Sequence, residues 1–463
     1  MNDCSFFTYT LPNNRHQILY GKIPSFLASI LIGGLVLGAP ASFASENDAA
    51  ATERNAPVTI SDNTALTEAQ VVQLMLPYRR KLQSLETSLE IEKYRYQSSG
   101  WIRNPELRIS DISNRYPNND YSELEIGLRI RIPDLGELSA EKQKARVDLW
   151  EKRVEAVRER QQLIARVRQN FADVILYDQL AELARQRVTK ERERLNVIER
   201  MVEIGSRSIV YFTKAKMWNA ESKNDYDRAV QKQSFARRTL ARRSGIAEDT
   251  PLATSDLPEV TQDVDVLINL AYKNRPEIQL VDQRIELTNR QKRYEIMQLF
   301  PWPNYVEISH HEEMKKTDTD WRELKLGIQL PLFNWNSGNI KATSLAVKKK
   351  EDESVAIRES IEDEVRTAYD TYKDLLLDWK NFKVSADELI TNANAVVEQA
   401  HHHQTLMPDE VYEMDITIIE TKKLLSERRW NLAYALIELY YAMGIEGPEK
   451  LNELKAGNGQ SND

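Results

Sequence analysis

Five of the six histidines in the sequence fall in two clusters, His310–His311 and His401–His403. Imidazole nitrogen is a frequent ligand of zinc, copper and nickel ions, so both clusters could bind a metal. Successive residues of a helix point about 100° apart, so three adjacent histidines in a regular helix cannot hold one ion. His401, His402 and His403 are therefore weak metal candidates. The alternative is an exposed polar run near the end of a helix.

The sequence carries no catalytic set beside these histidines. It has no glycine-rich phosphate loop, no nucleophile motif and no HExxH pattern. Its many carboxylates alternate with Lys and Arg along helical stretches, as on the solvated faces of coiled coils. We therefore expect neither an enzyme nor a bound cofactor. The net charge of −8 also provides no basic surface for a nucleic acid.

Residues 1–44 have the pattern of a signal peptide. Arg15 and Lys22 precede an apolar core, and small residues offer a cleavage site after Ala44. The only cysteine, Cys4, falls in the segment to be removed, so the mature chain is expected to lack disulfides and thiolate sites. No later stretch approaches the roughly 18 apolar residues of a transmembrane helix. If the chain enters a membrane, it must do so as strands.

Two long stretches without glycine or proline dominate the remaining sequence. Gly136 and Gly205 bracket 68 residues, and Gly338 and Pro408 bracket 69 more. Apolar residues recur within them at spacings of three or four between charged neighbours, which is typical of coiled coils. At 1.5 Å per residue, each stretch predicts a helix about 100 Å long. The break at Gly205, followed by Ser-Arg-Ser, then needs an explanation.

The sequence contains two tandem repeats, and corresponding residues lie about 200 positions apart. Gly127 matches Gly327, and Gly245 matches Gly444. Each copy begins with a helical stretch (66–99 and 264–299), continues with two strand-like segments and ends with a long helical run and a shorter one. The predicted boundaries are an N-terminal segment at 45–65, repeats at 66–245 and 263–445, a linker at 246–262 and a disordered polar tail at 446–463.

The second strand-like segment of each copy alternates strictly between aliphatic and polar residues. This is the pattern of an outer-membrane strand, whose apolar face meets lipid and whose polar face meets a water-filled lumen. Arg129 would lie on the lumen face, so we expect it to tolerate replacement. The alternative is a soluble sandwich with one buried face. Four strands cannot close a membrane barrel, which needs about eight, so the membrane interpretation requires an oligomer. The lipid-facing residues would be Leu124, Ile126, Leu128, Ile130, Leu324, Leu326, Ile328 and Leu330.

Together these features resemble the TolC family of outer-membrane efflux proteins, including its metal-ion efflux branch. The likeness extends over about residues 66–445. Its most specific parts are the duplicated strand hairpins, "PLFNWNSG" at 331–338, "LAYKNRPEI" at 270–278 and "GSRSIV" at 205–210.

The resemblance implies a mainly helical fold with membrane strands. Three copies would form a 12-stranded β-barrel continued by an α-helical barrel in the periplasm of a Gram-negative bacterium. Such a trimer is a passive exit duct for efflux or type I secretion. Its partners are outer-membrane lipid, a periplasmic adaptor and an inner-membrane pump of RND or ABC type. The competing hypothesis is a periplasmic adaptor or a structural coiled-coil protein of the envelope.

The resemblance also assigns roles to the two helical turns. Gly205 would end the descending helix, Ser208 or Ser206 would cap the returning one, and Arg207 would point outward where adaptors dock. A solvated turn charge is the alternative for Arg207. The second turn has Leu406 in place of this arginine, which puts an adaptor contact there in doubt.

Acidic residues after the second turn would line the periplasmic aperture of the trimer. These are Asp409, Glu410 and Glu413, which follow Pro408. The last two are three residues apart and so share one face of a helix. Attraction to the positive end of the helix dipole could alone explain Asp409 and Glu410, but it explains Glu413 less well because the effect fades beyond the first turn. Both explanations stay open.

Overall fold

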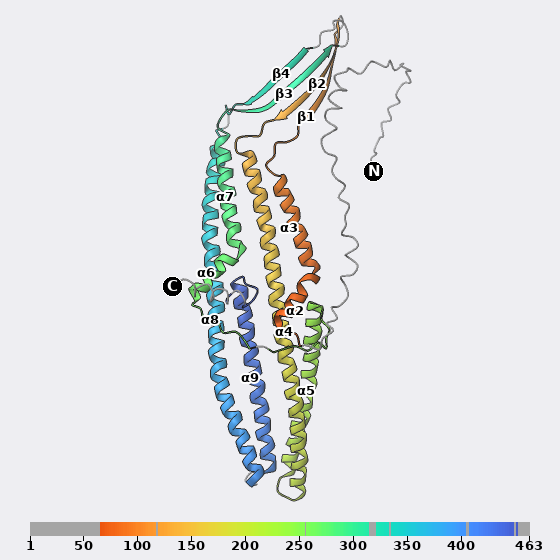
Figure 1. The fold of residues 1–463 in the computed structure, drawn as a ribbon, viewed down its shortest axis with the longest axis vertical. Helices are drawn as coiled ribbons and strands as arrows, with labels where there is room; N and C mark the ends of the chain where they lie inside the picture. The colour runs from red at the N-terminus through yellow and green to blue at the C-terminus, as the bar shows by residue number, and fades with distance from the viewer. Residues whose placement is uncertain are drawn as a thin grey trace, which may run out of the picture. The chain divides into compact units, whose positions relative to one another are not determined.

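The computed structural model describes residues 65–116, 119–254, 256–313, 321–332, 335–403, 407–448 and 451. All of them belong to one compact unit within Pro57–Asp463. The expected signal peptide, nearly all of the segment 45–65 and most of the tail lie outside the described residues. The unit places a four-stranded sheet at one end of its helices, and the first helical turn and the start of the last long helix at the other (Figure 1).

The two halves of this unit have the same order of elements. The first half contains α2 (Glu68–Met75), η1 (Leu76–Tyr78), α3 (Arg80–Ser98), β1 (Glu106–Tyr116), β2 (Asn119–Arg131), α4 (Glu137–Glu203) and α5 (Ile209–Ser244). The second contains α6 (Val264–Asn274), α7 (Pro276–Met297), β3 (Trp302–Glu313), β4 (Trp321–Gln329), α8 (Ser337–His403) and α9 (Pro408–Ala442).

The long helices α4 and α8 confirm the two predicted runs, and each spans 67 residues. Both begin beside the sheet and end at a turn. They pair with the shorter α5 and α9, and α4 also packs along α9, so the two hairpins lie side by side (Figure 1). Among the described helices, none is long and apolar enough to cross a membrane.

The helical stretches that open each half are broken, although each was expected to be continuous. In the second half, Pro276 starts α7 and Arg275 before it is extended, with φ −82° and ψ 113°. A proline disfavours the helical conformation in the residue before it and cannot donate an amide to the preceding turn. In the first half, Pro77 lies in the short η1 turn, and Arg79 after it is extended.

Two large apolar clusters hold the helices together. One buries Val71 of α2 with Phe171 and Val174 of α4 and Leu240 of α5. The other buries residues of α6, α7, α8 and α9, among them Leu267, Tyr372 and Leu439. The expected linker, 246–262, is hydrogen-bonded to the start of the first half. The backbone amide of Leu66 donates to the carbonyl of Pro251 at 2.9 Å.

The four strands form one antiparallel sheet in the order β1-β2-β3-β4. The two halves of the chain meet where β2 pairs with β3, with Leu128 opposite Ile308. Within the hairpins, Ile109 lies opposite Ile126 and Val306 opposite Leu326. β1 and β4 are therefore the two edges of the sheet.

Candidate functional site

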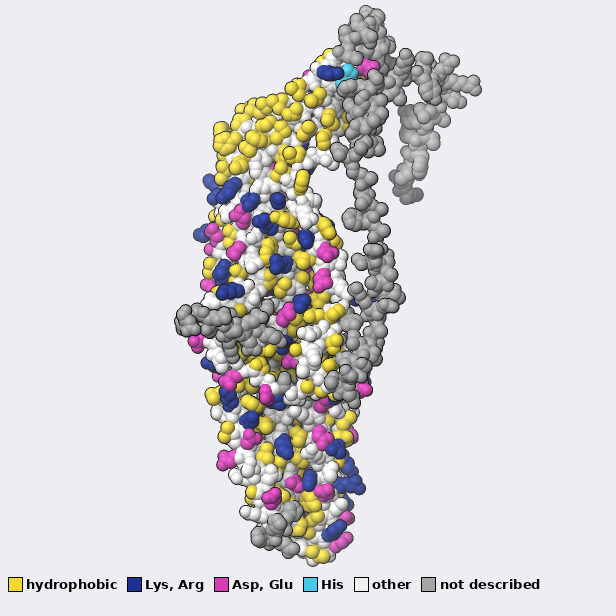
Figure 2. All heavy atoms as spheres, in the orientation of Figure 1, with side chains coloured by type: hydrophobic (Ala, Val, Ile, Leu, Met, Phe, Trp, Pro, Cys, Tyr) yellow, Lys and Arg dark blue, Asp and Glu magenta, His cyan; other side chains and the backbone are white. Residues whose placement is uncertain are grey.

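The sheet exposes its aliphatic face and covers the polar face of its inner strands β2 and β3, whereas polar residues of the edge strand β1 stay exposed. On β4 the side chains of Leu324, Leu326 and Ile328 are 70%, 58% and 56% exposed. On β3 the polar residues Glu307 and Ser309 are only 2% and 1% exposed. A water-soluble sheet has the opposite arrangement, since the hydrophobic effect buries apolar side chains first. Figure 2 shows the exposed apolar side chains gathered over the strands.

Most residues predicted to face lipid lie on this exposed face. Leu128, Ile130 and Leu330 are exposed in the same way, whereas Leu124 and Ile126 are partly covered. Leu107 and Ile109 of β1, each 66% exposed, extend the face and were not assigned to it from the sequence. Their alternation with Glu106, Arg108 and Ser110 was the available signal.

The covered face contains a buried carboxylate held by two arginines. Glu307 accepts from Nε of Arg129 at 2.6 Å and from Nη1 of Arg108 at 3.3 Å. The guanidinium of Arg129 also lies 4.2 Å from the ring centre of Tyr305. A buried charge without a partner is strongly unfavourable, so Arg129 stabilises this face. This contact argues against the expectation that Arg129 tolerates replacement, because its loss would leave Glu307 with Arg108 alone.

The matching glycines of the two halves make room on this face. A Cβ at Gly327 would overlap the ring of Tyr305, and one at Gly127 would lie 3.2 Å from a carboxylate oxygen of Glu307. Both positions thus allow a large side chain of β3 to lie across a neighbouring strand.

The first turn is built as the sequence predicts. Gly205 has φ +77°, a conformation that side chains disfavour, and the amide of Ser206 donates to the carbonyl of Met201 at 2.7 Å. Ser208 then caps α5, accepting from the amide of Tyr211 at 3.3 Å. The chain thereby reverses direction within four residues, Gly205–Ser208, between α4 and α5.

Arg207 does not point away from this turn as expected. Its Nη2 donates to both carboxylate oxygens of Asp409, at 3.1 and 3.0 Å. The hydroxyl of Tyr211 donates to the same carboxylate at 3.1 Å. Asp409 is fully buried in this arrangement, so its side chain does not line an opening. The physical reason is that a buried carboxylate requires donors, and the first turn supplies them.

The other two acidic residues of the second turn are also engaged. Glu410 accepts from the backbone amide of Met407 at 3.0 Å, which stabilises the start of α9. Glu413 pairs with Arg194 of α4 at 2.9 Å, although its side chain remains 61% exposed. Glu410 thus acts at the start of the helix, and Glu413 presents an exposed carboxylate that is paired with an arginine.

These contacts belong to a charged seam between the two hairpins. Basic residues of the first hairpin face acidic residues of the second at 2.9–3.5 Å; the seam comprises Arg187, Lys190, Arg194 and Arg207 with Asp409, Glu413, Asp415 and Glu420. Sequence reasoning missed the seam because the two partners of each pair lie about 200 residues apart. Glu191 is buried beside it, and this burial raises the pKa of its carboxyl.

The weak metal candidates of the second histidine cluster remain a prediction that the structure does not test. His401, His402 and His403 end α8, and their side chains lie outside the described part of the structure. Among the described residues, the group with ligand atoms close enough for a metal is Glu125, His311 and Glu323 on the covered face of the sheet.

No protein-family profile matches this sequence, and no curated protein does. Solved structures do match. CusC, studied for the changes that accompany folding and transmembrane channel formation, is 15% identical over 82% of this chain and 92% of its own, with a TM-score of 0.66. The outer membrane protein VceC of Vibrio cholerae is 14% identical over 81% and 96%, with a TM-score of 0.63.

A third match is the MtrE outer membrane channel of Neisseria gonorrhoeae in its open state. It is 16% identical over 82% of this chain and 89% of its own, with a TM-score of 0.61. At identities this low, the structural likeness establishes the fold alone. The chain therefore has the fold of the TolC-family outer-membrane efflux channels, which confirms at the level of the fold the resemblance seen in its sequence.

Proposed function

We propose that this protein is the outer-membrane exit duct of a tripartite efflux or secretion system in a Gram-negative bacterium. Substrates would pass through it from an inner-membrane pump to the exterior, without a cofactor or an energy source of its own. The two repeats, 66–245 and 263–445, would each contribute one strand hairpin to the membrane and one helical hairpin to the periplasm.

The observation that carries this proposal is the two-faced sheet. Its aliphatic side chains are exposed while Glu307 and the residues around it are covered, which suits a wall between lipid and a polar passage. A structural coiled-coil protein or an adaptor would have no need for such a face. The solved structures with this fold that are named above include one described as an outer membrane protein and one described as an outer membrane channel.

The edges of the sheet support an oligomer. In lipid every backbone amide and carbonyl needs a partner, so the outer edges of β1 and β4 must be paired. Three copies joined β4 to β1 would supply twelve strands, which exceeds the minimum of about eight for a membrane barrel. The long helices would continue this barrel as a periplasmic tunnel.

We place the adaptor contact at the first turn, Gly205–Ser208. Apolar side chains are exposed around it: Ile204 is 76% exposed, Ile209 64% and Val210 63%. Gly205 and Ser208 would shape this surface, and Arg207 would fix it to the second hairpin through Asp409. An exposed apolar patch of this kind is typical of a protein contact.

We place the periplasmic aperture at the start of α9. Three copies would gather Glu410 and Glu413 around the opening, where like charges concentrate a cation-attracting field. Asp409 would lie behind them and hold the two turns together. Replacing Glu410 and Glu413 with Gln should reduce cation preference in single-channel recordings, whereas unchanged selectivity would leave only their roles in helix capping and pairing.

The proposed function is tested by isolating the protein from the outer membrane. We expect a trimer that resists SDS until heated and that forms conducting channels in planar bilayers. A monomer recovered from the periplasmic fraction, with no conductance, would support the rival adaptor or structural role instead.

A further inference from the structure

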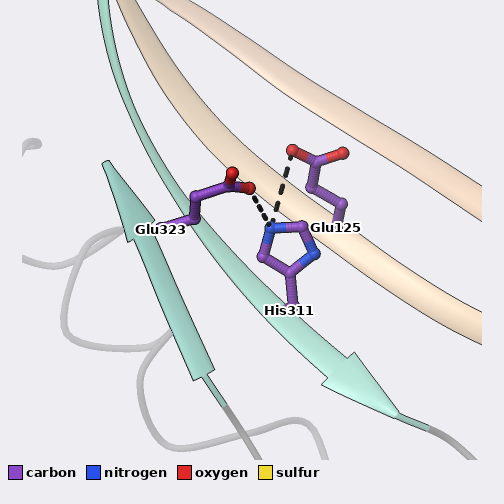
Figure 3. Close-up of side chains that lie close together, drawn as sticks. All are labelled: Glu125, His311 and Glu323. Carbon is purple, nitrogen blue, oxygen red and sulfur yellow. Dashed lines mark ion pairs between the residues drawn. The ribbon is translucent and has the colours of Figure 1, made fainter. Parts of the chain in front are cut away.

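Three potential metal ligands meet on the covered face of the sheet, one from each of three strands. His311 of β3 lies between Glu125 of β2 and Glu323 of β4 (Figure 3). Its Nε2 is 3.2 Å from an oxygen of Glu323 and 3.8 Å from an oxygen of Glu125. All three ligand atoms lie within 4.8 Å of one another.

These separations are close to those of a tetrahedral metal site. A zinc ion bound at about 2.0–2.1 Å holds its ligand atoms about 3.4 Å apart. The two distances from His311 bracket that value, and the three ligand atoms lie within 4.8 Å of one another. Glutamate side chains rotate about several bonds, so their oxygens can adjust to a bound ion while the strands stay in place.

The imidazole and one carboxylate are held in place by neighbours. The ring of His311 stacks on Trp321, with centroids 3.9 Å apart and planes 8° apart, and its side chain is only 5% exposed. The hydroxyl of Ser110 donates to Glu125 at 3.0 Å. The hydroxyl of Ser309 lies 3.1 Å from Nε2 of His311, the ligand atom itself, so a bound ion would replace this contact. Contacts that fix the orientation of ligands raise metal affinity.

A cation already lies between the carboxylates. The ammonium of Lys325 is 2.6 Å from Glu125 and 3.1 Å from Glu323. Two carboxylates whose oxygens lie within 4.8 Å of each other are stabilised by a positive charge between them, and Lys325 provides it on a long, flexible side chain. An ion that replaced this ammonium would find the two carboxylates and the imidazole converging on it.

We propose that Glu125, His311 and Glu323 form a binding site for a divalent transition-metal ion of the zinc type, and that Lys325 occupies it in the absence of metal. The imidazole nitrogen selects for such ions over Mg²⁺ and Ca²⁺, which prefer oxygen ligands. Three protein ligands leave a fourth position open, so a bound ion would keep one water or an exogenous ligand. Metal binding would displace the lysine from between the carboxylates.

The test measures Zn²⁺ binding to the purified full-length protein in detergent, after treatment with EDTA, by competition with a chromophoric chelator. His311→Ala should weaken binding by more than about 100-fold, since loss of even an outer contact weakens metal sites about 10–100-fold. His310→Ala is the matched control, because this neighbour lies on the opposite face of β3 and should change nothing.

Lys325→Met separates the loss of a metal ligand from a loss of folding, because it is expected to increase binding and an unfolded protein would not. Removing the competing ammonium should strengthen Zn²⁺ binding by at least about tenfold, because one like charge no longer opposes the ion. Co²⁺ should give the intense visible absorption of a four-coordinate site, and this should disappear in His311→Ala. Equal binding in His311→Ala and the wild type would overturn the proposal, as would weaker binding in Lys325→Met or equal competition by Mg²⁺. The measurement involves no transport, so its outcome does not depend on whether the protein is an exit duct.

Discussion

An arginine at position 109 tests most directly whether the aliphatic face of the sheet meets lipid. Ile109 is the fourth of the 11 residues of β1 and is 66% exposed, and its side chain belongs to the exposed face. If that face met water, Ile109→Arg would change the free energy of unfolding by no more than about 0.5 kcal/mol, as for most surface substitutions.

In lipid the same change has a much larger cost. An arginine facing lipid near the middle of a bilayer destabilises a membrane barrel by about 2–4 kcal/mol. This lowers the folded-to-unfolded ratio by about 30- to 700-fold for each chain. Three copies would bring the loss to about 6–12 kcal/mol for the assembled trimer.

Ser110→Arg is the matched control for this experiment. Ser110 is the next residue of β1, is exposed on the polar face and lies opposite Glu125, which can accept a further cation. We therefore expect it to fold with nearly wild-type stability. Urea titration of refolding into lipid vesicles, followed by the shift of the folded band on unheated gels, measures both variants. Equal stability of the two variants would refute the assignment of the faces.

Three further predictions concern single residues. Gly327→Ala should destabilise by about 1–3 kcal/mol, because its methyl group overlaps the ring of Tyr305; restoration of the melting temperature by Tyr305→Ala checks the cause. Gly205→Val should cost about 1–2 kcal/mol in backbone strain, and Gly205→Asn less, as measured by urea midpoints; equal losses would contradict a role for positive φ. Glu191→Gln should raise the melting temperature at neutral pH, because burial raises the pKa of the native carboxyl and disfavours its charge. This gain should vanish as the pH falls through the raised pKa toward the ordinary value of 4.5, and a gain that persists at low pH would point to another cause.

Local patterns in the sequence predicted the elements that depend on local physics. The absence of glycine and proline over long runs predicted α4 and α8, because little else can interrupt a helix. Strict alternation predicted the strands and the face they expose. The breaks at Pro77 and Pro276 were missed, although the prolines themselves were a sufficient signal.

Contacts between distant segments could not be predicted in the same way. The pairing of Arg207 with Asp409 depends on how the two helical hairpins lie against each other, and the sequence does not state that arrangement. The approach of His311 to Glu125 depends on the pairing of β2 with β3, which joins the two halves of the chain. Both contacts depend on how the two halves of the chain pack against each other, which local sequence patterns do not determine.

The separation between the sheet and the helical core has a consequence for biogenesis. Among the described residues, the buried apolar clusters contain side chains of the helices and their connecting segments and none from the four strands. The helices therefore have a driving force for folding in water, whereas the strands gain theirs only when an apolar surface covers Leu324, Leu326 and their neighbours. A newly made chain can thus complete its helical hairpins first and carry unfinished strands to the place where they assemble. The order of maturation is set by which solvent each part requires.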